Sequence, residues 1–230
     1  MKSVEIIIPV LNEEKSLASS VSKLNSFLDT IGKNYTWIIH IVDNGSEDST
    51  PLVGDELQKK FTKVKFSQLP ERGRGRALKY AWTTSKSDIV GYMDVDLSTD
   101  IKSINTLVDS IASNQYLVAT GSRLMKKSDV IGRTLKREII SRCYSLLVRL
   151  TFGINILDFQ CGFKFLNGDT ARKIVPLIVD KGWFFDTELI LLAHSLNYDI
   201  NEVPVRWVDD PDMRSKIVQD GDAAILGVGL

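Results

Sequence analysis

Short apolar runs alternate with helical patterns through the first half of the chain, and this alternation constrains the fold most. The run from Val4 to Val10 is nearly continuous, which is typical of a strand buried on both faces of a sheet. Apolar residues at 17–31 then recur at helical spacing. Further strands are predicted at 37–42, 64–69, 89–93 and 116–120, with helices between them. Such repetition predicts an α/β fold, with a mostly parallel sheet and helices on both of its faces.

The second half of the chain reads differently. Residues 134–152 predict one long amphipathic helix. The predicted elements after it are a strand at 162–166, helices at 168–179 and 185–196, and a last strand at 200–208. Because no repeat, linker or low-complexity segment interrupts the pattern, we expect residues 1–230 to form a single domain of two lobes that divide near residue 122.

Composition excludes several classes of protein. Lys plus Arg is 29 and Asp plus Glu is 29, whereas a non-specific nucleic-acid binder is normally basic, so we expect no nucleic-acid partner. Cys143 and Cys161 are too few for a disulfide framework, which favours a reduced, cytoplasmic setting. The sequence has no run of about 18 apolar residues that would predict a membrane span.

Polar clusters follow three of the predicted strands. The first strand leads into Asn12 and Glu13, the second into Asp43, and the fourth into Asp94 and Asp96. In open parallel sheets, ligands bind beyond the carboxyl ends of the strands. One polar loop after a strand is ordinary, but three at the same edge favour a binding site.

Among these polar residues, the pair Asp94 and Asp96 gives the strongest indication of a binding site. Side chains two apart on an extended segment point the same way, so both carboxylates should face one side. Two like charges so close are unfavourable unless a cation neutralises them. Carboxylate oxygens suit Mg²⁺ or Mn²⁺, which keep waters and share a substrate's phosphates. The alternative is a pair that caps the next helix, although Ser98, Thr99 and Asp100 are also available for that.

Three arginines alternate with two glycines at 72–76. Glycine lets a backbone approach a ligand closely, and arginine suits phosphate. The segment is not a dinucleotide fingerprint, because the third glycine position is Leu78 and the segment follows the third strand instead of the first. A solvated basic turn is an equal alternative.

Taken together and in order, these segments resemble the family-2 glycosyltransferases of the GT-A fold. The resemblance is greatest to the dolichyl-phosphate glucose and mannose synthases and their bacterial polyprenyl-phosphate relatives. Each segment is weak alone, but the ordered set covers nearly the whole chain. The segments are 8–13, 42–50, 72–75, 93–96, 121–123, Arg137 with Ser141, 158–164, 185–188, 202–207 and 215–216. The segments 160–164 and 185–188 look closer to the glucose synthases.

The resemblance implies roles on the donor side. The residues implied to bind the nucleotide sugar are Pro9, Asn12, Glu13, Asp43, Arg74 and Asp94. Asp94 and Asp96 match the pair that binds the metal, Mg²⁺ or Mn²⁺, which carries the diphosphate. Two departures stand out: Ser98 replaces a glutamine of the mannose synthases, and Arg74 replaces the usual lysine of the glycine-rich turn.

It also implies roles on the acceptor side. The residues implied to lie near the lipid phosphate are Arg123, Arg137, Ser141 and Lys216. Asp158 matches an acidic residue assigned as catalytic in some relatives, and we group it with Arg123 and Arg137 as catalytic candidates.

The activity implied is that of a metal-dependent, inverting hexosyltransferase. It would move a hexose from a nucleotide diphosphate sugar, with UDP-glucose favoured, to a polyprenyl or dolichyl phosphate. Residues 1–122 would bind the nucleotide sugar and residues 123–230 the acceptor. A phosphate monoester has a second pKa of about 6 and is mostly a dianion at neutral pH, so it needs positioning more than it needs a base. Catalysis should therefore depend little on Asp158 as a base and strongly on the cations that position the phosphate.

Other functions stay open. A family-2 enzyme could act on a hydroxyl of a glycolipid or polysaccharide, which commonly needs a carboxylate base, or could use GDP-mannose and dolichyl phosphate. A sugar-1-phosphate nucleotidyltransferase usually has a glycine-rich, basic loop after the first strand, where this chain has 9–13. A protein that only binds nucleotide would not need the intact Asp94 and Asp96.

The predicted helix at 134–152 also suggests a membrane contact. Its apolar stripe consists of Ile139, Ile140, Cys143, Leu146, Leu147 and Leu150. The cations around it are Arg133, Lys136, Arg137, Arg142 and Arg149. This pattern favours an anionic membrane surface about as much as packing in the core. We expect a protein peripheral to the cytoplasmic face of a membrane. It is either a short peripheral form or a chain that segments beyond residue 230 tether to the membrane, as in many relatives.

Overall fold

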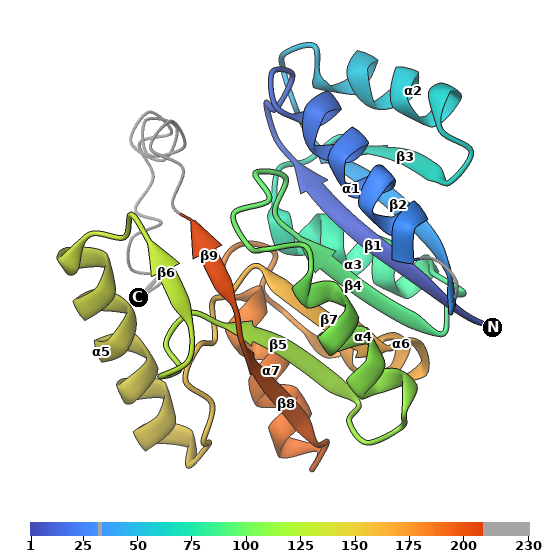
Figure 1. Ribbon diagram of the computed structural model, residues 1–230. Helices are drawn as coiled ribbons and strands as arrows, with labels where there is room; N and C mark the ends of the chain where they lie inside the picture. The colour runs from blue at the N-terminus through green and yellow to red at the C-terminus, as the bar shows by residue number, and fades with distance from the viewer. Residues whose placement is uncertain (32–33, 209–230) are drawn as a thin grey trace.

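The computed structural model describes residues 1–31 and 34–208 (Figure 1). Within these residues the main sheet has seven strands in the order β3-β2-β1-β4-β7-β5-β8. The strands are β1 (Lys2–Val10), β2 (Tyr35–Asn44), β3 (Val64–Leu69), β4 (Ile89–Met93), β5 (Val118–Ser122), β7 (Phe163–Asn167) and β8 (Ile200–Pro204). Neighbours pair in parallel, except that β7 is antiparallel to β4 and β5. The predicted mostly parallel sheet is confirmed.

Helices cover both faces of this sheet, as predicted (Figure 1). They are α1 (Leu17–Ile31), α2 (Thr50–Lys60), α3 (Arg74–Thr84), α4 (Ser103–Ala112), α5 (Leu135–Phe152), α6 (Gly168–Ile174) and α7 (Phe185–Ser195). The helices α1, α2 and α4 pack on one face, and α3, α6 and α7 pack on the other. The residues of β1 alternate between these layers, with Ile6 and Ile8 in the first core and Ile7 in the second. Burial from both sides explains the continuous apolar run of β1.

The strand register brings the polar clusters to one edge. Val10 at the end of β1 pairs with Asp43 in β2, and Ile7 pairs with Tyr92 near the end of β4. Because these three strands are parallel neighbours, the loops that follow them leave the sheet side by side. The expectation that Asn12, Asp43 and Asp94 share an edge follows from this pairing.

The reversed strand β7 decides what lies opposite those loops. Met93 at the end of β4 pairs with Phe163 at the start of β7, and Thr120 in β5 pairs with Lys164. The segment 158–162 therefore enters the sheet at the edge where β4 and β5 leave it. The second half of the chain reaches the first half's polar edge through this one antiparallel strand.

The predicted last strand, 200–208, is wrong as a single element. It divides at Val205 into β8 and a separate β9 (Arg206–Val208), which leaves the main sheet and pairs with β6 (Asp129–Ile131). Trp207 of β9 also forms a bridge with Thr99, which places β9 beside the loop after β4. The predicted fifth strand is shifted as well, because β5 begins at Val118 instead of residue 116.

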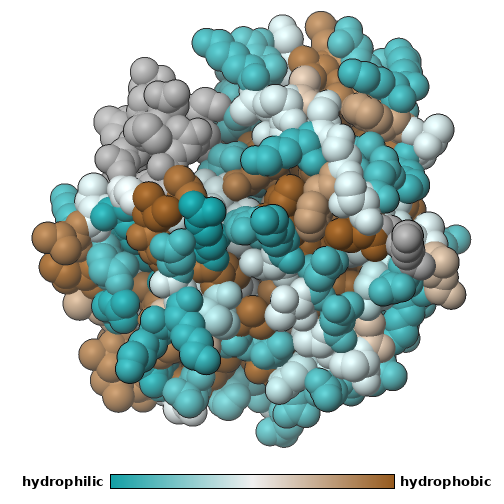
Figure 2. Space-filling view, in the orientation of Figure 1, coloured by the Kyte–Doolittle hydropathy of each residue, from teal (hydrophilic) through white to brown (hydrophobic). Residues whose placement is uncertain are grey.

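The long helix α5 contacts the core through only a few side chains, among them Val148 and Tyr144. The Thr134 side chain caps its first turn by accepting from Arg137 N, and Gly153, with φ of 65°, ends it in the left-handed conformation that suits glycine. Its buried residues are Ser145 and Val148, whereas Leu135 is 82% exposed and Leu150 is 76% exposed. Hydrophobic side chains gather over α5 at the left of Figure 2. No helix in the described part of the chain is long and apolar enough to cross a bilayer.

Candidate active site

The loops after β1 and β2 hold each other in place. Asn12, with φ of 55°, donates its backbone N–H to Ser46 Oγ over 2.8 Å, and its Oδ1 accepts from Glu47 N at 2.9 Å. Glu13 N donates to Thr50 Oγ1 over 2.7 Å. These cross-links fix the two loops before any ligand arrives, which reduces the entropic cost of binding.

Asp43 is the buried acid of this edge. Its side chain is fully buried, and its Oδ1 accepts from Ser46 N at 3.2 Å and from the Ser46 hydroxyl. Its Oδ2 has no hydrogen-bond partner within the described residues. A buried acceptor without a partner is costly, so this oxygen fits an N–H or O–H of a ligand. Pro9, also predicted as a donor-binding residue, lies buried in β1 opposite Val42.

The prediction that Asp94 and Asp96 lie on an extended segment is wrong, because the segment after β4 is a turn. Leu97 N donates to the Asp94 carbonyl over 3.2 Å, and Leu97 has a positive φ of 51°. The Asp96 carboxylate accepts from Ser98 N at 2.9 Å and from Ser98 Oγ at 2.7 Å. The two acids are still close enough for Asp96 to act on the pKa of Asp94. Ser98 orients Asp96.

Arg74, the first residue of α3, bridges two acids. Its Nη2 lies 2.9 Å from Asp94 Oδ1, and its Nη1 lies 3.2 Å from Asp186 Oδ2. The guanidinium also lies 4.9 Å from the ring centroid of Tyr92 and 4.8 Å from that of Trp183. An arginine with this many partners has little freedom, so it fixes the direction of the Asp94 carboxylate.

Sequence reasoning missed the buried pair behind Arg74. Lys164 is fully buried, and its Nζ lies 2.9 Å from Asp186 Oδ1. The same Nζ donates to the carbonyls of Phe159, at 3.0 Å, and Cys161, at 2.6 Å. The pair therefore connects α7 to the segment that enters β7. The sequence did contain one indication of this pair, namely a lysine inside the apolar strand Phe163–Asn167. Buried lysines are rare unless they are paired, so such a lysine predicts an acidic partner.

Gly162 packs directly on Asp94. A Cβ atom at this position would overlap Asp94 Oδ2 and would lie 2.8 Å from Arg74 Nη2. Gly73 and Gly75 also serve packing, because a Cβ on either would crowd the backbone of Lys181, and Arg76 N donates to the Lys181 carbonyl. The glycines of 72–76 thus bring α3 close to the loop before α7.

The acids after β4 fit a divalent cation. Burial raises the pKa of Asp94 to about 6, against the opposing charge of Arg74, and the Asp96 charge adds to the rise. A carboxylate in this state gains from a nearby cation. No group of three or more His, Cys, Asp or Glu side chains in the described part of the chain could hold a metal. Waters and donor phosphate oxygens would therefore have to complete the shell, as is usual for Mg²⁺.

Among the residues predicted for the acceptor side, Asp158 and Arg123 form a buried ion pair. Asp158 Oδ2 accepts from Arg123 N at 2.9 Å and from Nε at 2.8 Å, and Oδ1 accepts from Nη2 at 2.9 Å. Burial acts to raise the pKa of Asp158, but the Arg123 charge and hydrogen bonds outweigh it and lower the pKa to about 2. An acid with so low a pKa is a poor proton acceptor, so the geometry favours a positioning role for Asp158.

Of the other predicted acceptor residues, Arg137 shares a tryptophan with Arg123, and Ser141 contacts Arg133. The guanidinium carbons of Arg123 and Arg137 each lie 5.8 Å from the ring centroid of Trp207. The Ser141 hydroxyl accepts from Arg133 Nη2. Lys216 lies outside the described residues.

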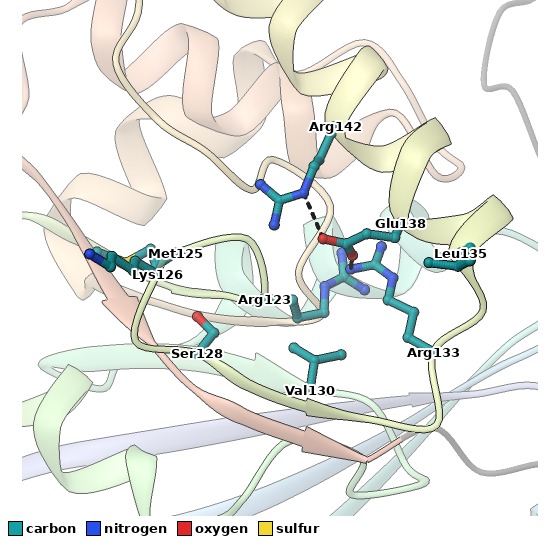
Figure 3. A pocket seen from close by; sticks show the side chains of 9 residues that line it. All are labelled: Arg123, Met125, Lys126, Ser128, Val130, Arg133, Leu135, Glu138 and Arg142. Atoms are coloured by element: carbon teal, nitrogen blue, oxygen red, sulfur yellow. Dashed lines mark hydrogen bonds and ion pairs between the residues drawn. The ribbon is translucent and has the colours of Figure 1, made fainter.

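A cavity of about 360 Å³ opens beside Arg123 (Figure 3). Its cationic lining comes from Arg123, Lys126, Arg133 and Arg142, and Glu138 is the acid among them. From the sequence, the helix that carries Arg142, with Arg133 beside it, was expected to lie at a membrane surface or to pack in the core. The cavity that these two arginines share was not predicted.

Solved structures with the same fold are enzymes of sugar transfer. Glucosyl-3-phosphoglycerate synthase from Mycobacterium tuberculosis, in complex with UDP, superposes with a TM-score of 0.68 at 18% identity, covering 100% of this chain and 82% of that one. Mannosyl-3-phosphoglycerate synthase from Rubrobacter xylanophilus gives 0.67 at 13% identity, covering 97% and 73%. These similarities establish the GT-A fold.

Sequence comparison identifies the family. Glycosyltransferase AglD of Haloferax volcanii is 31% identical over 227 residues, which are 98% of this chain but 36% of AglD. A dolichyl-phosphate beta-glucosyltransferase of Dictyostelium discoideum is 32% identical over 217 residues, 90% of this chain and 66% of the relative. This chain thus spans about a third of the first and two thirds of the second. The model of glycosyl transferase family 2 matches residues 5–174, and the chain belongs to that family.

Proposed function

We propose that this chain transfers glucose, with inversion, from UDP-glucose to a polyprenyl or dolichyl phosphate in a metal-dependent reaction. The observation that carries this proposal is that Asp158 is held in an ion pair by Arg123, beside a cavity lined with cations. A hydroxyl acceptor needs a base, whereas a phosphate dianion needs cations that position it. The relatives named dolichyl-phosphate beta-glucosyltransferase support the acceptor class, and the synthase solved with Mn²⁺ and UDP-glucose supports the donor class.

On the donor side, each residue has a task that its geometry permits. Asp43 Oδ2 accepts a hydrogen bond from the nucleoside, and Asn12 and Glu13 shape the loop around it. Asp94 and Asp96 would hold Mn²⁺ or Mg²⁺, which would stabilise the negative charge on the departing diphosphate. Arg74 keeps Asp94 aimed at that place.

On the acceptor side, an oxygen of the lipid phosphate forms the new bond to the anomeric carbon. The bond from that carbon to the donor's β-phosphate oxygen breaks, and the nucleoside diphosphate leaves with the electron pair. Arg123, Arg137, Ser141 and Lys216 hold the lipid phosphate in line, and Asp158 holds Arg123. Residues 1–122 then serve the donor and residues 123–230 the acceptor.

We propose further that α5 contacts the cytoplasmic face of an anionic membrane. Its exposed stripe includes Leu146, Leu147 and Leu150, and Arg142 and Arg149 flank that stripe. Replacement of Leu146 and Leu150 by Glu should reduce flotation with anionic vesicles severalfold. Leu52→Glu, at an exposed leucine of α2, is the matched control. Equal flotation of both variants would contradict the role of α5.

The proposed reaction is tested by a thermal-shift panel of UDP- and GDP-sugars with Mn²⁺, followed by transfer to a short polyprenyl phosphate. We expect UDP-glucose to give the largest shift and to be consumed in transfer. A larger shift and faster transfer with GDP-mannose would instead identify a mannosyltransferase. Stabilisation by no nucleotide sugar would contradict the assignment of the donor edge.

A further inference from the structure

The cavity beside Arg123 has a charge that matches a particular anion. Four cations line the cavity: Arg123, Lys126, Arg133 and Arg142. Glu138 lies between Arg133 and Arg142, and Asp158 pairs with Arg123, so four positive and two negative charges leave a net charge of +2. A phosphate monoester at neutral pH is mostly a dianion. One such group would neutralise the cavity.

Arg133 has unused capacity to bind an anion. Its side chain is 7% exposed, and Nη2 donates to Ser141. Its Nη1 lies 3.2 Å from Glu138 Oε2 but makes no hydrogen bond within the residues that the structure describes. A guanidinium offers five N–H donors in a fork that suits phosphate oxygens. Arg133 is therefore the best-placed buried cation for a ligand that enters the cavity.

The cavity also has an apolar side. Met125, Val130 and Leu135 line it together with the cations (Figure 3). Leu135 is also the first residue of α5, the helix that carries the exposed leucines, and is itself exposed. A ligand that fits both sides has a phosphate joined to a hydrocarbon chain.

Glu138 limits how much negative charge the cavity accepts. Its Oε1 accepts from Arg142 Nε at 2.6 Å, four residues along the helix, and its Oε2 faces Arg133. The carboxylate therefore lies among the cations, where a bound phosphate would lie close to it. Each further negative charge on a ligand is repelled by Glu138 and finds no cation left to balance it.

We propose that this cavity holds the phosphate and first carbons of the acceptor, and that Glu138 makes it selective for a lipid monophosphate over the corresponding diphosphate. The assignment rests on the proposed transfer to a lipid phosphate and adds Arg133 and Glu138 to it as specificity-determining residues. Arg133 binds the phosphate, and Glu138 sets the charge limit.

The test measures binding without turnover. Geranyl phosphate and geranyl diphosphate are titrated calorimetrically into the protein in the presence of chelator, so that no metal recruits the diphosphate to Asp94 and Asp96. We expect the wild-type chain to prefer the monophosphate. Glu138→Gln should shift the ratio of the two dissociation constants by about tenfold towards the diphosphate. Arg133→Gln should weaken binding of both ligands by about tenfold.

Two further variants separate charge from folding. Glu138→Asp keeps the charge and should keep most of the preference for monophosphate. Asp55→Asn removes an acid that also pairs with a cation four residues along a helix, Lys59 of α2, and should leave the ratio unchanged. An unchanged ratio in Glu138→Gln, or an equal shift in Asp55→Asn, would overturn the role of Glu138.

The outcomes also separate this inference from the proposed function. A selective cavity in a protein that transfers no glucose to any lipid phosphate would keep the binding assignment and refute the reaction. The opposite result is also possible: the protein transfers glucose to a lipid phosphate, but its Glu138→Gln and Arg133→Gln variants bind both geranyl ligands as the wild type does. That result would keep the reaction and refute the cavity assignment.

Discussion

The proposed donor edge and the proposed acceptor side of this protein are organised differently. At the proposed donor edge, short hydrogen bonds tie the loop after β1 to the loop after β2, and Asp94 after β4 is fixed between Arg74 and Gly162. On the acceptor side, one buried ion pair, Arg123 with Asp158, adjoins a cavity and a helix that is mostly exposed.

This difference indicates that activity depends on the geometry of the side chains at the proposed donor edge and on the total charge at the proposed acceptor side. A cation site held by two carboxylates depends on exact placement, so a small displacement should remove most activity. A cavity that gathers several cations around an anion shares the binding energy among them. Substitutions there should weaken acceptor binding in steps. The predictions below test this contrast.

The largest effect is expected at Asp96. Asp96→Asn should reduce metal-dependent transfer by at least about a thousandfold, because several kcal/mol of charge stabilisation are lost with the cation. Transfer rates are measured with Mn²⁺ and with excess chelator. Wild-type activity that persists in chelator would contradict the metal assignment, and with it the contrast between the two sides.

A smaller but still severe loss is expected at Gly162. Gly162→Ala should slow transfer by about a hundredfold, because the new methyl group must displace the Asp94 carboxylate. Gly182→Ala is the matched control, since a Cβ there would meet its nearest atom, Asp180 Oδ1, at 3.7 Å. Steady-state kinetics should show the loss in the first variant alone. Similar rates for the two variants would mean that the placement of Asp94 is not critical.

A graded effect is expected at Arg137. Arg137→Ala should reduce transfer by about tenfold, mainly through the KM of the acceptor, because one charge-assisted contact is lost among several. The KM of the donor should stay unchanged. Lys136→Ala, at the next residue of α5, controls for charge on the helix. Wild-type turnover in Arg137→Ala would remove this residue from the site.

The smallest effect concerns stability and pH. The folded-state pKa of Asp158, about 2, lies below its ordinary value of 3.8, so the pair with Arg123 stabilises the fold above about pH 4 and loses that contribution as the pH falls towards 2. Asp158→Asn should cost about 2 kcal/mol at pH 7 and less at pH 3, measured by urea unfolding. A difference independent of pH would argue against this ion pair.

Much of the fold was predictable because it depends on local patterns. Burial of β1 between two helical layers requires a continuous apolar run, and Val4 to Val10 supplies one. The direction of β7 was not predictable, because an apolar run does not encode which strands it pairs with or whether the pairing is parallel or antiparallel. The break at Val205 was hidden too, because both parts of 200–208 have the pattern of a strand.

For the site, the sequence identified residue types in order but not their partners. Asp94 and Asp96 do follow the end of β4, as predicted, although the segment that contains them is a turn. The pair of Lys164 with Asp186, and the place of Glu138 among cations, depend on contacts between distant segments. The predicted roles of the site residues stay predictions until the substitutions are made.

The most direct test of the central claim compares two acceptors that differ in one group. Polyprenyl phosphate and the polyprenol of equal length are offered separately, with UDP-glucose and Mn²⁺, and the glycosylated lipid is measured by mass spectrometry. We expect glucose on the phosphate-bearing lipid and none on the alcohol. Equal or greater transfer to the alcohol would contradict it.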